Sequence, residues 1–141
     1  MIVYRLTNHR GLDGKGAAKQ ANNRWNNLGT RVVYCAGSAA VAKGEISRRT
    51  PLNLLPEGFE LLLIEIPDDS VEDLEQLPER WDASPPGYGT KVVGDEFVQS
   101  QRKLALRVPS VYDKRSFNFL LNPLYPLFYR VKIVHSEPFY F

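Results

Sequence analysis

Three side chains of types that are common in active sites, Arg24, Tyr34 and Glu45, follow one another between residues 22 and 45. The planar guanidinium of an arginine can donate two hydrogen bonds to phosphate oxygens. A tyrosine offers an aromatic face and a hydroxyl group, and a glutamate can stabilise positive charge that develops in a transition state. Together the three residues suit a phosphate-bearing ligand held beside a carboxylate.

The same residues also have a structural explanation. Arg24 would be a solvated loop charge, Tyr34 a core aromatic, and Glu45 part of the outer face of a helix. Their surroundings favour the functional interpretation. Arg24 lies within the polar stretch NNRWNNLG, and Glu45 follows the apolar run AAVA at 39–42, where a solvated helix face would carry more charge.

Two strands, a loop and a helix are expected to position these residues. Short β-prone runs at 2–6 and 31–36 predict strands. Glycine and asparagine are frequent between them, at 11–29, which predicts a functional loop whose backbone approaches a ligand closely. Ser38 is placed to cap a helix that ends before Pro51.

Strands and helices are mixed in the rest of the chain. The expected strands are 59–66, 104–108 and 128–136, and the expected helices are 68–77 and 90–102. A proline-punctuated loop is expected to open the C-terminal third, from residue 118. The regular strand-helix alternation and the glycine-rich phosphate motif of a doubly wound fold are missing. The sequence therefore predicts a mixed α+β fold.

Length and composition set the class of protein. The 141 residues support one domain, residues 1–141, and 43% apolar residues are enough for a core. The net charge of +2 is too small to indicate direct nucleic-acid binding. No apolar run approaches the roughly 18 residues that span a bilayer, and the N-terminus has no leader pattern. We expect a soluble, unexported protein that does not bind membranes.

Cysteine and histidine are too few for several kinds of site. Cys35 is alone, so no internal disulfide can form, and its strand context predicts a buried thiol. His9 and His135 are the only histidines. These counts argue against a structural zinc site and a Ser-His-Asp hydrolase, and we expect no bound metal.

Several stretches resemble one known family in the same order. The segment RWNNLGTRVVYCAGSAAVAKGE, from Arg24 to Glu45, resembles the arginine, tyrosine and glutamate motifs of the RES domain. LALRVPSV at 104–111 resembles its serine motif, and NFLLNPLYP at 118–126 its Asn-Pro segment. The resemblance runs from the opening VYRL to this segment and so covers nearly the whole chain.

The resemblance implies a fold and a function. The fold would be similar to the ADP-ribosyltransferase catalytic domain, a split, twisted mixed sheet flanked by helices, with NAD as the substrate in the central cleft. RES proteins of known function are cytoplasmic bacterial toxins that deplete NAD or attach its ADP-ribose to a protein. Each is restrained by a helix-turn-helix antitoxin that blocks the active site, and a homodimer within that complex is left open.

Cleavage of NAD gives each matched residue an expected role. Glu45 would stabilise the oxocarbenium-like ribose, and Arg24 would bind the diphosphate. Tyr34 would contact nicotinamide, and Ser110 would bind the nucleotide or Glu45. Arg5 is expected either to line the cleft as a further ligand-binding residue or to form a structural ion pair.

Other polar residues have structural expectations, and the reaction itself stays open. Trp25 is expected to pack beneath its loop, and Asn118 and Asn122 to shape a loop through bonds to backbone. Water or phosphate as acceptor would make a glycohydrolase or a phosphorylase, and a protein side chain would make an ADP-ribosyltransferase. A module that binds a partner without catalysis is the alternative from another class.

Overall fold

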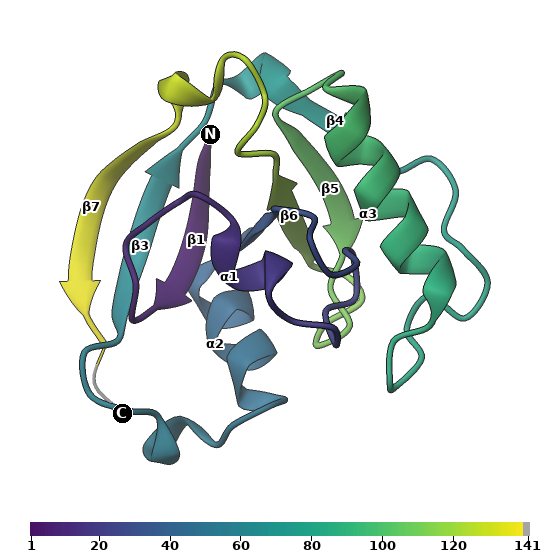
Figure 1. Cartoon of the computed structure of the whole chain (residues 1–141). Helices are drawn as coiled ribbons and strands as arrows, with labels where there is room; N and C mark the ends of the chain where they lie inside the picture. Colours follow the sequence, from purple (N-terminus) through teal and green to yellow (C-terminus); the bar gives the residue numbers. More distant parts are fainter. Residues whose placement is uncertain (140–141) are drawn as a thin grey trace.

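The computed structural model of the protein describes residues 1–139 and contains one twisted, mixed sheet (Figure 1). Its strands are β1 (Ile2–Thr7), β2 (Val33–Ala36), β3 (Glu60–Glu65), β4 (Val71–Asp73), β5 (Ala105–Pro109), β6 (Phe117–Leu121) and β7 (Lys132–Pro138). They are ordered β4-β5-β6-β2-β1-β3-β7, and all neighbours are antiparallel except β4 and β5.

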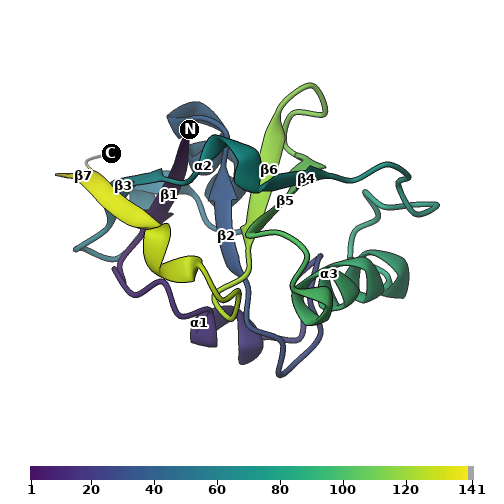
Figure 2. The ribbon, with the colours of Figure 1, turned by 90° about the horizontal axis from the view of Figure 1, so that it is seen from above.

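Within residues 1–139, three α-helices and three short 3₁₀ turns complete the fold. The helices are α1 (Lys15–Ala18), α2 (Ala39–Ser47) and α3 (Tyr88–Ser100), and the turns are η1 (Leu52–Leu54), η2 (Asp68–Ser70) and η3 (Phe128–Arg130). Helix α2 packs over β1 and β2, and α3 packs its Phe97 and Val98 against β5 and β6, where the sheet has turned strongly (Figure 2). None of the helices within residues 1–139 has the length and apolar character to cross a membrane.

The sheet is split between β1 and β2. These strands are joined at one residue pair, Tyr4 with Ala36, whereas β1 pairs with β3 along its full length. Beyond the single pair, the guanidinium of Arg5 reaches across and donates from Nη1 to the carbonyl oxygen of Tyr34 at 2.7 Å. A cavity therefore has room to open in the middle of the sheet.

Two expectations about secondary structure are wrong. Residues 68–77 do not form a helix, because η2 is followed by β4, whose Val71 aligns with Ala105 of the parallel strand β5. The stretch at 117–121 is not a loop but β6, which pairs on both sides with β2 and β5. In both places pairing with distant strands overrides local signals, and the prolines at 123 and 126 lie beyond the end of β6.

The remaining elements agree with the expected ones apart from their ends. Ser38 caps α2, accepting the N–H of Val41 on its side chain at 3.1 Å, and the helix ends at Ser47, before Pro51 as expected. The final strand starts at Lys132 because η3 precedes it. The predicted α+β fold is thus observed.

Candidate active site

A cavity of about 410 Å³ occupies the split in the sheet. Its walls include residues of β1, among them Arg5, and residues of β2, among them Tyr34. The loop before β2 adds Arg24, helix α2 adds Glu45, and the C-cap position that follows α2 adds Arg48. The cavity therefore brings together four of the five residues that the sequence singles out. The fifth, Ser110, lies behind Glu45.

Glu45 is held at the cavity wall by hydrogen bonds to one of its carboxylate oxygens. The Oε2 atom accepts from the hydroxyl of Ser110 at 3.1 Å and from the side-chain amide of Asn118. The Oε1 atom faces the Nη1 atom of Arg48, one turn further along α2, at 3.4 Å. Because the side chain of Glu45 is 23% exposed, it keeps access to the cavity.

Ser110 acts on Glu45 and has no exposed surface of its own. It directly follows β5, and its hydroxyl oxygen accepts the N–H of Asp113 at 3.2 Å. The hydroxyl hydrogen is therefore directed to Glu45. Of the two expected partners of Ser110, the nucleotide and Glu45, the geometry provides Glu45.

Glycine 44 permits close packing beside the carboxylate. The ring of Tyr112 lies so near that a Cβ atom at Gly44 would come within 2.2 Å of it. Tyr112 follows Ser110 by two residues, so its ring lies over α2 beside Glu45. A larger residue before Glu45 would require the exposed ring of Tyr112 to move.

The guanidinium of Arg24 is nearly buried at the cavity. Its Nη1 atom donates at 2.8 Å to the carbonyl oxygens of both Trp81 and Ala83. Within residues 1–139 the opposite edge, Nε with Nη2, forms no hydrogen bond. Burial, followed by repulsion from Arg48, lowers the pKa of Arg24, while the nearby Glu45 raises it. An anion in the cavity would relieve this repulsion.

Tyr34 uses its hydroxyl group to hold the loop that carries Arg24. The hydroxyl donates to Oδ1 of Asn26 at 2.6 Å and accepts the N–H of Trp25 at 3.1 Å. Burial raises the pKa of this hydroxyl, so it stays protonated. Tyr34 also lines the cavity, and its hydroxyl is already engaged with the loop.

Helix α3 holds the same loop from the other side. The ammonium of Lys91 donates to the carbonyl oxygens of Ala21 at 2.7 Å and Asn23 at 2.5 Å. One turn later, Asp95 accepts the backbone N–H of Asn27 at 3.0 Å and its side-chain amide at 2.8 Å. The loop on both sides of Arg24 is thereby fixed to a helix.

Close approach of the loop to α3 requires a glycine. A Cβ atom at Gly94 would lie 1.6 Å from the carbonyl oxygen of Trp25, which leaves no room for a side chain. Trp25 itself is buried against Phe97 and Val98, as expected for a residue that packs beneath the loop. The sequence signal for this contact was the glycine within a helix, flanked by Lys91 and Asp95.

Arg5 and Cys35 lie at the split. Arg5 lines the cavity and donates to backbone, so the cleft-lining expectation agrees with its position, and its Nε atom is buried without a hydrogen-bond partner in the described chain. Cys35 is buried as expected, and burial raises the pKa of its thiol to about 12.

The two predicted loop asparagines have different roles. Asn122 bonds to backbone as expected, donating to the carbonyl oxygen of Val98 at 2.9 Å and accepting the N–H of Leu124 at 3.0 Å. The prediction for Asn118 is wrong. Asn118 lies on β6 and its side chain contacts Glu45 instead of backbone. A polar residue within the run FNFLL was the available signal.

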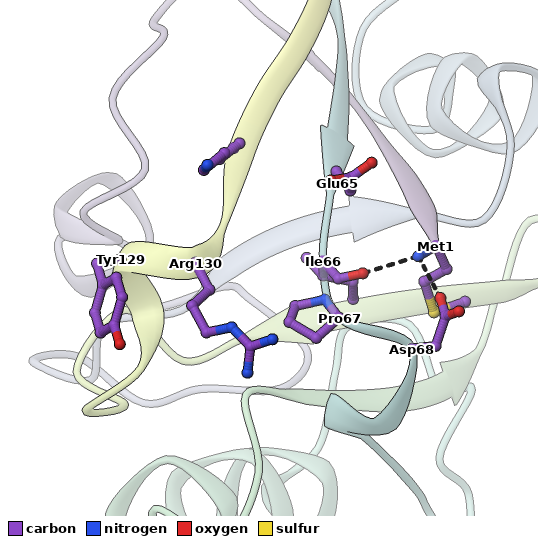
Figure 3. A pocket seen from close by; sticks show the side chains of 8 residues that line it. Met1, Glu65, Ile66, Pro67, Asp68, Tyr129 and Arg130 are labelled. Atoms are coloured by element: carbon purple, nitrogen blue, oxygen red, sulfur yellow. Dashed lines mark hydrogen bonds and ion pairs between the residues drawn. The ribbon is translucent and has the colours of Figure 1, made fainter.

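A second cavity, of about 480 Å³, lies at the ends of β1 and β3, away from the predicted residues (Figure 3). The N-terminal amine of Met1 donates there to Ile66 O at 2.8 Å and to Asp68 Oδ1 at 2.5 Å. The side chain of Asp68 is 89% exposed, and Tyr129 is also exposed. This cavity is therefore open and solvated, and the cavity in the split is the candidate active site.

In the described part of the chain no three metal-binding side chains converge.

Comparison with known proteins identifies the family of the chain. The protein-family model of the RES domain matches residues 2–141 of this chain. The chain belongs to the RES domain family. This membership confirms the resemblance. It rests on relatives that align with most of the chain, as well as on the motifs.

Two RES relatives illustrate the similarity. The "Prs ADP-ribosylating toxin" of Sphingobium sp. (strain YBL2) is 38% identical over 120 residues, which are 82% of this chain and 74% of that protein. A protein named "Toxin Res" from Photorhabdus laumondii subsp. laumondii is 34% identical over 130 residues, covering 88% of this chain and 83% of its own.

A solved structure has the same fold as this RES chain. It is a chain in the crystal structure of the M. tuberculosis MbcT-MbcA toxin-antitoxin complex, with a TM-score of 0.78 and 20% identity. The match covers 98% of this chain and 83% of that one. The ADP-ribosyltransferase-like fold class is thereby confirmed.

Proposed function

We propose that this chain is the toxin of a toxin-antitoxin system and that it consumes NAD. The observation that carries the proposal is the pairing, in one cavity, of the Glu45 carboxylate with the guanidinium groups of Arg24, Arg48 and Arg5. The names of the relatives, which include an ADP-ribosylating toxin, and the toxin-antitoxin complex of the structural neighbour support it. The proposed place of action is the cytoplasm.

The proposed reaction begins at the bond between ribose and nicotinamide. When the C1′–N bond breaks, its electron pair leaves with nicotinamide and positive charge develops on the ribose ring. The Glu45 carboxylate can accept a hydrogen bond from a ribose hydroxyl, and this bond strengthens as the charge develops. Glu45 is therefore assigned to the ribose.

The arginines suit the diphosphate of NAD. Nη1 of Arg24 is occupied by the carbonyl oxygens of Trp81 and Ala83, which leaves its Nε and Nη2 edge for phosphate oxygens. Arg48, exposed at the end of α2, lines the same cavity. Arg5 brings a further charge from β1. We assign Arg24 to the diphosphate and the other two to supporting charge.

Tyr34 and Ser110 have mainly supporting roles in this proposal. The ring of Tyr34 is available at the cavity for nicotinamide, whereas its hydroxyl is engaged with Trp25 and Asn26. Ser110 orients Glu45 and has no histidine beside it among its hydrogen-bond partners. It is therefore not proposed as a nucleophile.

The acceptor defines the reaction. With water or phosphate the protein is a glycohydrolase or a phosphorylase that depletes NAD, and this is the proposal we place first. With a protein side chain it is an ADP-ribosyltransferase, which the name of the Sphingobium relative favours. The three reactions share the same first step and the same use of Glu45.

Product analysis tests the proposal and separates the acceptors. Purified protein is incubated with NAD, with and without phosphate, and with a cell lysate as a source of protein acceptors. Release of nicotinamide with free ADP-ribose, phosphorylated ADP-ribose or a modified protein identifies the acceptor. If nicotinamide release by the wild type does not exceed that by Glu45→Gln, NAD consumption is rejected.

An antitoxin is the proposed protein partner. It would be a helix-turn-helix protein that covers the cavity, with a toxin homodimer possible within the complex. Its expected contacts are the 11–29 loop, much of which borders the cavity, and the 123–126 segment. Expression of the chain alone should lower cellular NAD and stop growth, and co-expression of the partner should reverse both effects. Unchanged NAD and growth at high expression would contradict the toxin assignment.

A further inference from the structure

Asn118 occupies a fixed point beside the carboxylate of Glu45. It lies on β6, a strand paired on both sides, opposite Ala36 of β2 and Val108 of β5. A residue at such a position has little backbone freedom. Its side-chain amide reaches the cavity and donates to Oε2 of Glu45.

The orientation of this amide follows from charge. An amide oxygen turned toward an ionised carboxylate would be repelled, whereas the NH₂ group donates to it. Ser110 donates to the same oxygen from the end of the neighbouring strand β5. Two donors fixed to the sheet therefore hold Oε2, and Oε1 is the oxygen that remains for another partner.

A competing partner for Glu45 lies on its own helix. Nη1 of Arg48 faces Oε1 at 3.4 Å, a long contact made by an exposed, flexible side chain. Without the donors on the sheet, only the long contact with Arg48 would hold the carboxylate, and the Glu45 side chain would be free to rotate. The sheet donors, and not Arg48, thus fix the orientation of Glu45.

We propose that Asn118 is a positioning residue that, together with Ser110, holds Oε2 of Glu45 so that Oε1 is presented to the ribose of the substrate. This inference rests on the proposed consumption of NAD. Asn118 acts through Glu45 and is not itself assigned a contact with the reacting atoms. Loss of its amide should therefore affect the chemical step more than substrate binding.

Steady-state kinetics of Asn118→Ala test this role. We expect kcat for nicotinamide release to fall about 10- to 100-fold, the range for loss of a residue that orients a reacting group, with KM changing less than about 3-fold. The matched control is Asn53→Ala, since Asn53 is an exposed asparagine on η1 outside the cavity. Unchanged kcat in Asn118→Ala would overturn the inference.

The pH profile of Asn118→Asp separates positioning from a structural role. At low pH the introduced carboxyl can hold a proton and donate it to Glu45 as the amide does, but at higher pH two carboxylates repel each other. The charged groups that face this pair are Arg48 on α2 and Arg24 in its loop. We expect activity relative to wild type to be highest near about pH 5 and to fall toward pH 8; a constant ratio would overturn the inference.

The outcomes also distinguish this inference from the proposed function. If wild type and Glu45→Gln are equally inactive on NAD, the proposed function fails. If the wild type is active and Glu45→Gln is not, the proposed function stands and the Asn118 variants decide the inference. A crystal structure of Asn118→Ala gives an independent measurement, because an unchanged Glu45 side chain would contradict positioning by the amide.

Discussion

The backbone N–H of Trp25 lies 3.1 Å from the hydroxyl oxygen of Tyr34 and donates to it. Strand β2 thereby holds the residue that directly follows Arg24. The tyrosine hydroxyl completes the link by donating to Asn26. The position of the arginine thus depends on a strand that begins nine residues later in the chain, at Val33, as well as on α3.

Replacement of Tyr34 by phenylalanine should separate the hydroxyl from the ring. We expect a loss of about 1–3 kcal/mol in the free energy of unfolding, because a buried partner is left unsatisfied, and a higher KM for NAD. Urea denaturation and steady-state kinetics measure the two effects. Tyr129→Phe, at a 75% exposed tyrosine, is the control. Unchanged stability and KM would show that the link to the loop is dispensable.

Replacement of Gly94 by alanine should displace the Arg24 loop from α3. The added methyl group would meet the carbonyl oxygen of Trp25, so we expect at least about 2 kcal/mol of destabilisation by overpacking. Gly87→Ala is the matched control, since a Cβ atom there has no neighbour within 4 Å. Equal melting temperatures for the two variants would contradict the close approach.

Replacement of Lys91 by methionine tests the other contact of α3 with the loop. The carbonyl oxygens of Ala21 and Asn23 would lose their donor, at a cost of about 1–3 kcal/mol. The substitution should accelerate amide hydrogen exchange more in residues 21–27 than in β6. The control is Lys103→Met. Lys103 is exposed and donates to the backbone carbonyl of Asp69, away from this loop.

Replacement of Arg24 by lysine should keep the charge and lose the planar fork. An ammonium cannot bond to Trp81 and Ala83 and also present two parallel donors to a phosphate, so NAD affinity and turnover should both stay impaired. Isothermal titration and kinetics measure them. If lysine restored both, Arg24 would be a general positive charge and not a bidentate ligand.

Replacement of Glu45 by glutamine should keep the fold and lose turnover. The remaining side-chain oxygen can still accept from Ser110 and Asn118, but the charge is lost. We expect about 2–4 kcal/mol less transition-state stabilisation, or roughly a 30- to 1,000-fold lower kcat. Circular dichroism and a thermal melt check the fold. Turnover near the wild-type level in a folded variant would remove Glu45 from the mechanism.

The sequence predicted the central residues of the site because their motifs are local. Arg24, Tyr34 and Glu45 sit in a loop, a strand and a helix whose signals are each strong: asparagine and glycine, β-branched residues, and a serine cap. Their meeting in one cavity followed from family resemblance and not from spacing. The structure adds the reason, which is the divergence of β1 from β2.

What the sequence could not predict depends on distant pairing. Strand β4 has three residues and exists because β5 lies beside it, and acidic residues near Asp68 locally favour a helix start. Asn118 looked like part of a loop because Pro123 and Pro126 follow closely, although the strand ends before them. The contacts of Lys91 and Asp95 with the loop span 68 to 70 residues of chain.

The single joining pair of β1 and β2, Tyr4 with Ala36, has a consequence for how the family can vary. Where two strands diverge, their facing peptide groups lose the partners that a continuous ladder would supply. Arg5 satisfies one of them, the carbonyl of Tyr34, and a bound ligand can satisfy others. Because every residue carries a backbone carbonyl, and every residue except proline a backbone N–H, most substitutions leave these main-chain groups in place. Substitution of side chains around the split therefore leaves most of these polar main-chain groups available to the proposed ligand.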